Sequence, residues 1–392
     1  MRRSILIHLA IVSSMLGACT LQPTQTSEPA LSATSPTQTA LVATNPPEVS
    51  ATLAVDCHPV TIQPSRSLEP VFVETVKSTL MLQVGGQPPV PVGEFPDLGG
   101  IKDSLIIEDT LYLLRETGIQ RIQLSDCTND TLVELNHSVM SGSLLLASGG
   151  QRLFYATVDG TTRESIAGYV DLKDSTSHEV FSYMEDELLT FALLGLTENG
   201  QGIYLLQHGQ DPSLRKILIV DIKKAAVAGE LTIEGYGEAD LSPDGSMLAV
   251  NNQVVDASDP KYPVYYQLNI YNLTAPSGTP PKAFDYPNAP SELGYGRILW
   301  SPDGQRAYFL VIDSAYEPTT AYGLWSLDVA SGSMTKVAAM PDPTLHASTI
   351  SPDGAWILLR AETKDETFQV NSQTGEVKLF SASVEAILTG WQ

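Results

Sequence analysis

The chain has 392 residues, a length that fits two or three ordinary domains or one large repetitive domain. It carries 45 acidic and 22 basic residues, for a formal net charge of −23. So negative a surface argues against a nucleic-acid partner, whose phosphates require clustered Lys and Arg. The 29 glycines and 26 prolines, without a long helix-forming stretch, exclude a typical helical bundle and indicate a turn-rich, all-β chain.

The first nineteen residues have the layout of an export signal. A short basic start at residues 1–3 precedes an apolar run at residues 5–16, which is too short to span a membrane stably. The sequence Leu-Gly-Ala-Cys follows, with its cysteine at Cys19. This ending resembles the lipobox of bacterial lipoproteins, which implies removal of residues 1–18 and a diacylglycerol on the Cys19 thiol, with an acyl group such as palmitate on its amino group. An ordinary cleaved signal or an uncleaved anchor is the alternative.

Residues 20–55 predict a flexible tether. More than half of them are Ser, Thr, Pro or Gln, and only two are charged. Such a segment cannot bury enough apolar surface to offset the cost of ordering it. We therefore divide the chain into a signal at 1–18, a lipidated cysteine and tether at 19–55, and a folded domain at 56–392. The domain is expected outside the cytoplasm, anchored to the bilayer of the cell membrane or outer membrane.

Internal repeats organise the folded domain. A Ser-Pro-Asp-Gly sequence followed by an apolar strand occurs at residues 242–245, 301–304 and 351–354. Weaker copies precede it near residues 109, 150 and 200. The six positions run from residue 109 to residue 354, an average spacing of 49 residues. Such a period is typical of propeller blades or solenoid arrays.

Ser-Pro-Asp-Gly has the chemistry of a tight turn between strands. Proline presets φ for the first central position, aspartate suits the second, and glycine takes the left-handed position that closes the hairpin. Because aspartate in such a turn bonds its own backbone, we expect these residues to be structural, and a metal or catalytic cluster is the alternative. The residues concerned are Asp244, Gly245, Asp303, Gly304, Asp353 and Gly354.

A second pattern shares the spacing but has a different phase. Apolar alternation ends in Asp or Asn before a turn, at Asp126, Asp171, Asp221, Asn272, Asp328 and Asn371. Two hairpin signals per period predict a four-stranded unit. An imperfect outer hairpin at residues 80–86 and a lone inner-type strand at 387–391 supply the halves of one more unit. We therefore predict an all-β propeller of seven four-stranded blades, closed by N- and C-terminal strands. Six blades, or an open stack of sheets, are the alternatives.

The Ser-Pro-Asp-Gly units followed by apolar strands resemble the TolB-type, WD-repeat-like β-propellers of bacterial envelopes, including lipoproteins that carry such a propeller behind a tether. The resemblance covers roughly residues 57–392. It implies the fold and almost nothing about the ligand, because one fold hosts many functions. TolB itself has an additional N-terminal α/β domain that this chain lacks, so the role of TolB in membrane integrity is not carried over.

Cys57 and Cys127 are the two cysteines of the folded domain. An exported domain permits disulfides, and two is an even number. Cys57 lies where the tether ends, and Cys127 follows the first well-formed outer strand. We predict a bridge that joins the N-terminal segment to the first full blade, and two free buried cysteines are the alternative.

The sequence contains no recognisable catalytic motif. It has no Gly-x-Ser-x-Gly elbow, no His-Glu-x-x-His, no Cys-x-x-Cys and no EF-hand loop, so nothing local supports an enzyme, a metal or a cofactor. The first hypothesis is a membrane-anchored binding or protein-interaction module, which we expect to be monomeric. An enzyme with a channel-centred site, and a structural or sensor subunit of an envelope complex, are the alternatives.

Tyrosines mark the one region that breaks the period. The interval from Gly245 to Gly304 is 59 residues, and nine of the 15 tyrosines fall within residues 262–322. Some belong to acidic, Pro-rich loops, where aromatic rings beside carboxylates suit a glycan, a peptide or a partner protein. The candidate binding residues are Tyr286, Tyr295 and Tyr316. Packing of these rings between blades is the alternative.

Overall fold

The computed structural model describes residues 52–53, 57–60, 69–95, 100–147, 149–184, 190–208, 214–234, 239–255, 264–276, 278–285, 293–313, 323–340, 345–361, 366–381 and 387–391. These residues belong to one compact unit and form 29 strands and no helix. None of the described segments is therefore a helix long and apolar enough to cross a membrane.

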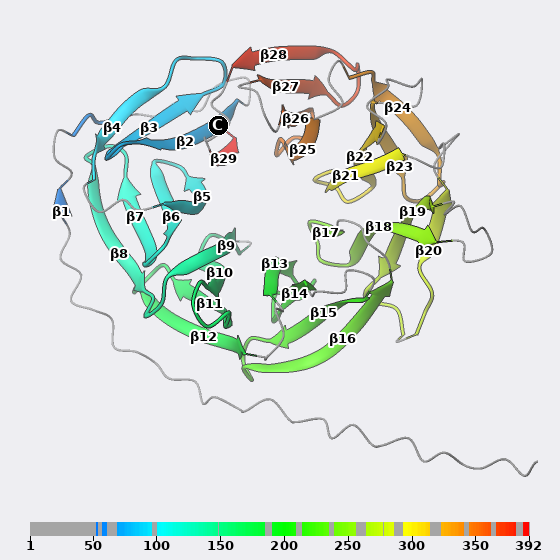
Figure 1. Cartoon of the computed structure of the whole chain (residues 1–392), viewed down its shortest axis with the longest axis horizontal. Helices are drawn as coiled ribbons and strands as arrows, with labels where there is room; N and C mark the ends of the chain where they lie inside the picture. The colour runs from blue at the N-terminus through cyan, green and yellow to red at the C-terminus, as the bar shows by residue number, and fades with distance from the viewer. Residues whose placement is uncertain are drawn as a thin grey trace, which may run out of the picture. The chain divides into compact units, whose positions relative to one another are not determined.

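The strands form seven antiparallel sheets, the blades of a propeller arranged in a ring (Figure 1). From inner to outer strand, blade 1 holds β29 (Ile387–Trp391), β2 (Pro70–Val76), β3 (Thr79–Val84) and β4 (Val90–Glu94). Blade 2 holds β5 (Ile101–Ile107), β6 (Thr110–Arg115), β7 (Gly118–Gln123) and β8 (Thr128–Glu134), and blade 3 holds β9 (Val139–Leu146), β10 (Arg152–Asp159), β11 (Ser165–Asp171) and β12 (Thr176–Tyr183).

The other four blades repeat this order. Blade 4 holds β13 (Thr190–Leu196), β14 (Gly202–His208), β15 (Leu214–Asp221) and β16 (Ala226–Glu234), and blade 5 holds β17 (Ala239–Leu241), β18 (Met247–Val255), β19 (Val264–Asn272) and β20 (Lys282–Asp285). Blade 6 holds β21 (Leu293–Trp300), β22 (Arg306–Asp313), β23 (Gly323–Asp328) and β24 (Met334–Ala338), and blade 7 holds β25 (Leu345–Ile350), β26 (Trp356–Ala361), β27 (Glu366–Asn371) and β28 (Val377–Ser381). The prediction of seven four-stranded blades is confirmed.

Blade 1 closes the ring. Its innermost strand, β29, comes from the C-terminal end and pairs with β2 from the N-terminal side, with Val73 opposite Ile387. This is the predicted closure, and it leaves no free inner edge in the blade. A fifth strand, β1 (Thr52–Leu53), pairs with β8 on the outside of blade 2. Strand pairing thus begins at Thr52, ahead of the predicted start of the domain at residue 56.

The core lies between blades, because each sheet is covered on both faces by its neighbours. Val71 and Leu82 of blade 1, for example, pack with Leu111 and Ile122 of blade 2, and all four are almost fully buried. Similar clusters fill the five seams from blade 2 to blade 7. Apolar residues on both faces of a strand explain why the blades have no hydrophilic side and must stack as a ring.

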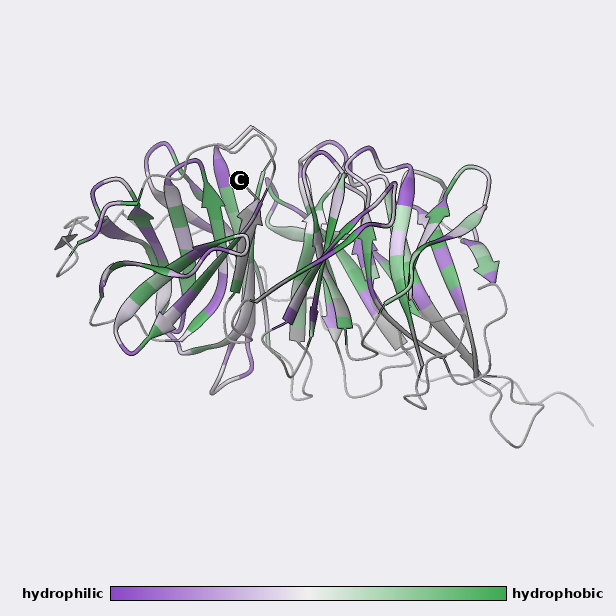
Figure 2. Ribbon diagram, turned by 90° about the horizontal axis from the view of Figure 1, so that it is seen from above, coloured by the Kyte–Doolittle hydropathy of each residue, from purple (hydrophilic) through white to green (hydrophobic). Residues whose placement is uncertain are grey.

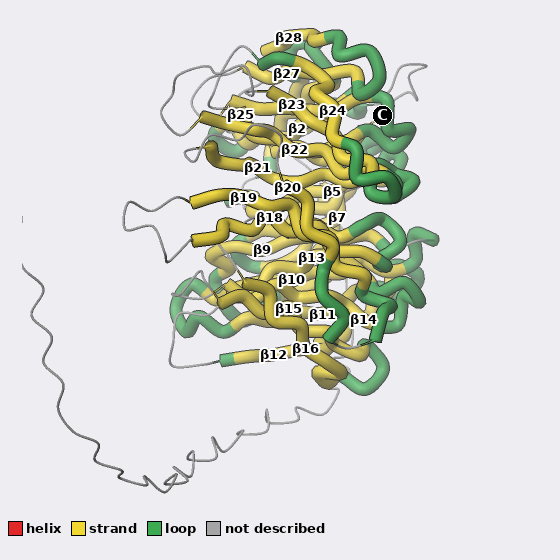
Figure 3. Tube along the Cα trace, turned by 90° about the vertical axis from the view of Figure 1, so that its right-hand side faces the viewer, coloured by secondary structure: helices red, strands yellow, loops and turns green. Residues whose placement is uncertain are grey.

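The ring has two faces that differ in their connections. The turn face carries the links from first to second and from third to fourth strand of each blade, such as residues 242–246 and 222–225. The loop face carries the links from second to third strand and from blade to blade, such as 116–117 and 135–138. The hydrophilic turns of the turn face line the upper edge of Figure 2 and the right-hand side of Figure 3.

Candidate functional site

The Ser-Pro-Asp-Gly turns are closed by their own side chains. In the turn of blade 5, the Oδ1 atom of Asp244 accepts hydrogen bonds from the Ser242 hydroxyl at 2.6 Å and from the Ser246 backbone N–H at 3.0 Å. The Ser242 oxygen in turn accepts the backbone N–H of Met247 at 2.9 Å. These bonds, first that from Ser242 and then that from Ser246, lower the pKa of Asp244. Gly245 has a φ of 72°, the left-handed conformation that glycine adopts without strain.

The turns of blades 6 and 7 have the same geometry. Asp303 and Asp353 each accept the hydroxyl of the serine two residues earlier at 2.6 Å, and Gly304 and Gly354 have φ values of 68° and 72°. The described residues hold no group of three or more His, Cys, Asp or Glu that could bind a metal ion. The carboxylates thus act as turn closures. The serine belongs to the motif found in the sequence, but its role as hydrogen-bond donor to the aspartate was not predicted.

The second repeat pattern forms matching turns on the same face. Each of its six Asp or Asn residues accepts a backbone N–H from its own turn, as when Asp221 accepts that of Lys224 at 2.9 Å. The two turns of a blade are also joined to each other, because the N–H that follows the third strand donates to the last carbonyl of the first turn. In blade 4 this bond runs from Ile222 to Gln201 at 2.9 Å. Side chains of the turn face are therefore engaged in stabilising it.

Cys57 and Cys127 are joined by a disulfide. Cys127 is fully buried in the turn between β7 and β8. The segment that begins at Cys57 also makes two backbone hydrogen bonds, from His58 N–H to the carbonyl of Val92 in blade 1 and from Val60 N–H to the carbonyl of Leu124 in blade 2. We call residues 57–60 the strap, because they bridge the closing blade and its neighbour on the turn face.

The remaining predicted site residues are Cys19, Tyr286, Tyr295 and Tyr316. Cys19, Tyr286 and Tyr316 lie outside the described residues. Tyr295 belongs to β21, where its backbone pairs with Val311.

The inner strands meet around the centre of the ring, and one partly buried carboxylate joins two of them. Asp103 of β5 accepts the backbone N–H of Leu144 in β9 at 2.6 Å and that of Ser104 at 2.8 Å. Burial raises the pKa of Asp103, while the two backbone hydrogen bonds and the charge of Arg297 act in the opposite direction. A carboxylate that accepts an edge N–H of the neighbouring blade ties blades 2 and 3 together.

Irregular pairing shapes the inner strands. The register skips Lys102 in β5, Leu194 in β13 and Ser348 in β25, and it skips two residues in β21. Such bulges turn side chains away from the regular alternation. The bulge of β21 includes Arg297, which is exposed and whose charge acts on Asp103. The centre of the ring thus holds an acid and a base from well-separated blades.

A pocket of about 270 Å³ opens on the loop face at the end of blade 2. The Nη1 atom of Arg115 donates to Oε1 of Gln120 at 2.7 Å, and Nε2 of Gln120 donates to Oδ1 of Asn129 at 3.1 Å. Gln120 and Asn129 are buried, so these two hydrogen bonds fix the Arg115 guanidinium from the interior of the blade. Sequence reasoning missed the pocket, whose lining is Arg115, Thr117, Gly118, Ile119, Gln120, Thr131, Glu134, Leu135 and Asn136.

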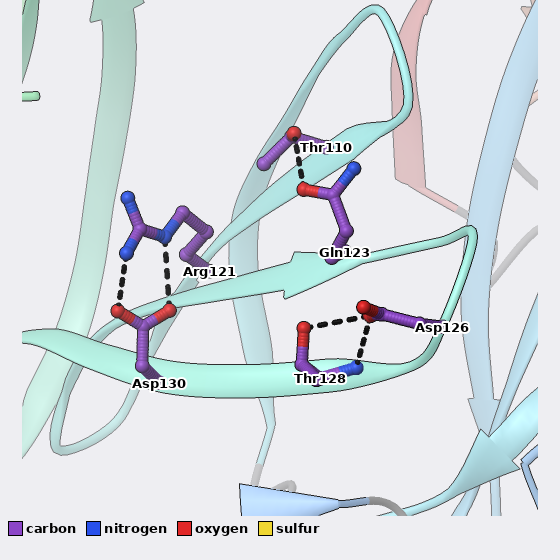
Figure 4. A network of polar contacts seen from close by, with 6 residues as sticks. All are labelled: Thr110, Arg121, Gln123, Asp126, Thr128 and Asp130. Carbon is purple, nitrogen blue, oxygen red and sulfur yellow. Dashed lines mark hydrogen bonds and ion pairs between the residues drawn. The ribbon is translucent and has the colours of Figure 1, made fainter. Parts of the chain in front are cut away.

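The opposite side of the same hairpin is fixed by charge. Arg121 and Asp130 form a two-pronged ion pair across β7 and β8, with distances of 2.9 and 2.6 Å (Figure 4). The hydrogen bond to Asp130 raises the pKa of the Arg121 guanidinium further above its usual value. Figure 4 also shows Thr128 bonded to Asp126 in the turn. The strands that carry the pocket are thus held in register independently of any ligand.

Comparison with known proteins identifies the fold. No protein-family model and no curated protein sequence matches the chain. An oligogalacturonate lyase solved in complex with manganese is similar with a TM-score of 0.54 and 13% identity, over 80% of this chain and 84% of that one. A functionally unknown protein from Desulfotomaculum acetoxidans has a TM-score of 0.52 and 14% identity, over 83% and 98%. A structure from Agrobacterium tumefaciens described as a possible TolB has a TM-score of 0.38 and 20% identity, over 57% and 72%. The first two similarities show the β-propeller fold.

Proposed function

We propose that this protein is a lipid-anchored module of the cell envelope, whose propeller binds its ligand on the loop face. The observation that carries the proposal is the contrast between the two faces. Polar side chains of the turn face are engaged within their own turns, whereas the pocket beside Arg115 opens on the loop face. Loops supported by a rigid scaffold are where binding residues concentrate in proteins.

The anchor is supported by the order of segments in the sequence. A basic start, an apolar run and Cys19 precede the tether, and the disulfide of Cys57 suits an oxidising compartment outside the cytoplasm. Metabolic labelling with a fatty-acid analogue such as alkynyl palmitate should mark the wild-type protein in the membrane fraction. Cys19→Ala should lose the label and be released from that fraction, and a labelled Cys19→Ala protein would contradict lipidation at this residue.

Tyr286 and Tyr316 in their loops, together with Tyr295 of β21, are the proposed contact for a larger partner, such as an envelope protein or peptide. We expect crosslinking in intact cells, followed by mass spectrometry, to recover a reproducible partner. Replacing Tyr286, Tyr295 and Tyr316 together with Ser should abolish its capture. Lys173→Ala with Lys223→Ala, both exposed on the turn face, is the control that should leave capture unchanged. Equal recovery by the tyrosine variant would refute this assignment.

A channel-centred enzyme is the second candidate function, and one observation favours it. Asp103 lies near the centre of the ring, and burial raises the pKa of its carboxyl group. A raised pKa is common for catalytic acids. Its two backbone hydrogen bonds, however, already give it a structural task. A screen of the folded wild-type protein for hydrolase and lyase activities tests this candidate. If Asp103 is a catalytic acid, Asp103→Asn should lose any activity that the screen finds.

A further inference from the structure

We infer that the pocket at the end of blade 2 binds one neutral sugar unit. The inference names a ligand class on the loop face and so rests on the proposed function of that face. Three strand ends and two connections build the pocket, from Arg115 at the end of β6 to Asn136 after β8. All nine lining residues belong to the described part of the chain.

The backbone forms the pocket through a bulge. Ile119 pairs with Val133 and Gln120 with Thr131, so the register skips Leu132. Leu132 is 1% exposed and belongs to the core between blades 2 and 3, whereas Thr131 is exposed and lines the pocket. The bulge thus directs Leu132 into the core and Thr131 toward the pocket. Bulges beside binding sites commonly redirect side chains in this way.

Close approach of the two strands requires a residue without a side chain at Gly118. A Cβ added there would lie 2.0 Å from the carbonyl oxygen of Val133, which is far inside contact distance. Gly118 therefore lets β7 and β8 come together at the mouth of the pocket. Any larger residue at Gly118 would push the strands apart.

The polar groups are positioned in advance. Gln120 uses its carbonyl oxygen for Arg115 and its amide nitrogen for Asn129, so both polar atoms of this buried side chain are satisfied. Binding sites whose donors are already fixed avoid the entropy cost of ordering them. Arg115 therefore needs no ligand to hold its place.

The chemistry of the lining selects a neutral, hydroxyl-rich ligand. One cation, Arg115, and one carboxylate, Glu134, share the pocket, so a charged ligand would be attracted by one of them and repelled by the other, and the lining favours neither sign of charge. Threonine hydroxyls at Thr117 and Thr131 and the amide of Asn136 supply both donors and acceptors. Sugar hydroxyls also donate and accept, and they match such a mixed set better than a carboxylate or an amine.

The volume limits the ligand to a single ring. The pocket has a volume of about 270 Å³. It lies slightly below the range of about 300–1,000 Å³ that is common for drug-sized ligands. A protein partner would need a far larger surface, of about 800 Å² per side. One terminal sugar of a glycan is therefore the occupant that fits.

Saturation-transfer NMR with glucose, galactose and N-acetylglucosamine as probes tests the inference on the purified full-length wild-type protein. Glucuronic acid and glucosamine serve as the anionic and cationic counterparts. We expect at least one neutral sugar to bind with a dissociation constant in the millimolar range and to bind more tightly than its charged counterpart. Absence of any signal from the neutral sugars, or tighter binding of a charged one, would overturn the inference.

Two variants place the sugar in this pocket. Thr131→Val with Glu134→Gln changes two exposed side chains, so the fold should be retained, and affinity should fall by about tenfold or more. Ser125→Ala, in the exposed turn at the other end of the same hairpin, is the matched control. Unchanged affinity in the double variant would place the sugar elsewhere and refute the site. Cellular crosslinking that still recovers a partner would then leave the proposed function intact, whereas loss of both would reject both.

Discussion

The turn face and the loop face are built from the same strands but by different chemistry. On the turn face, the links are short, and a carboxyl or amide oxygen of Asp or Asn closes nine of them. On the loop face, connections such as 116–117 and 135–138 differ in length and in residue type. The comparison indicates that stability is concentrated on one side of the ring, which leaves the other free to vary with the ligand.

On the turn face, a recurring hydrogen bond also connects the two turns within a blade. The hydrogen bond from the third strand's turn to the first turn recurs in six blades, from Leu124–Asp109 in blade 2 to Ser372–Ala355 in blade 7. Each blade is thereby closed at its turn end whatever the loop face carries. Substitutions on the turn face should consequently affect stability, and those on the loop face should affect binding.

Removal of the disulfide of the strap should have the largest effect on stability. The bridge closes a separation of 70 residues, so Cys57→Ser with Cys127→Ser should lower the free energy of unfolding by about 2–5 kcal/mol. Urea unfolding without reductant measures this loss. Adding reductant to the wild type should reproduce it, and a reduced wild type as stable as the oxidised form would contradict a stabilising role for the strap.

Two glycines of the Ser-Pro-Asp-Gly motif differ in how closely their surroundings pack against them. Gly245→Ala would place a Cβ 2.3 Å from the carbonyl oxygen of Leu196 in blade 4, whereas Gly304→Ala would meet nothing within 4 Å. Both alanines bear the strain of a positive φ, about 1 kcal/mol. Gly245→Ala should therefore cost about 3 kcal/mol and Gly304→Ala about 1 kcal/mol in chemical unfolding. Equal costs would show that the contact with blade 4 is not tight.

The turn aspartates should give the smallest effect, and it should depend on pH. Their hydrogen bonds lower the pKa of Asp244, Asp303 and Asp353, so the stability they add is present above pH of about 4 and is lost as the pH falls through the lowered pKa values. Replacing all three with Asn keeps the accepting oxygen but removes the charge.

The triple Asn variant should lose less than about 1 kcal/mol at neutral pH, because the turns are largely exposed to solvent. Below a pH of about 4, its thermal unfolding temperature should fall less steeply than that of the wild type. Parallel curves for the two proteins would show that these carboxylates do not contribute to acid sensitivity.

The blades could be predicted from sequence because their signals are local. Proline, aspartate and glycine at fixed positions identify one turn, and the Asp or Asn after an apolar strand identifies a second. Two turns in each period of 49 residues predict four strands per blade. The hydrogen bond that Leu144 donates to Asp103 could not be predicted in this way, because it joins strands of different blades. Nor could the pocket, which depends on a one-residue bulge at Leu132 and on the approach of strands at Gly118. Contacts that arise only after strands assemble carry no periodic signature.

The pairing of β2 with β29 determines the order in which the ring can be completed. In six blades the four main strands are consecutive in the chain, so each can form soon after it has been synthesised. Blade 1 must wait for residues 387–391, more than 300 residues after β2. Until then the edge of β2 is exposed to other chains, and closing so long a loop makes the last step slow. Refolding should thus end in one slow phase, reported by the environment of Trp391.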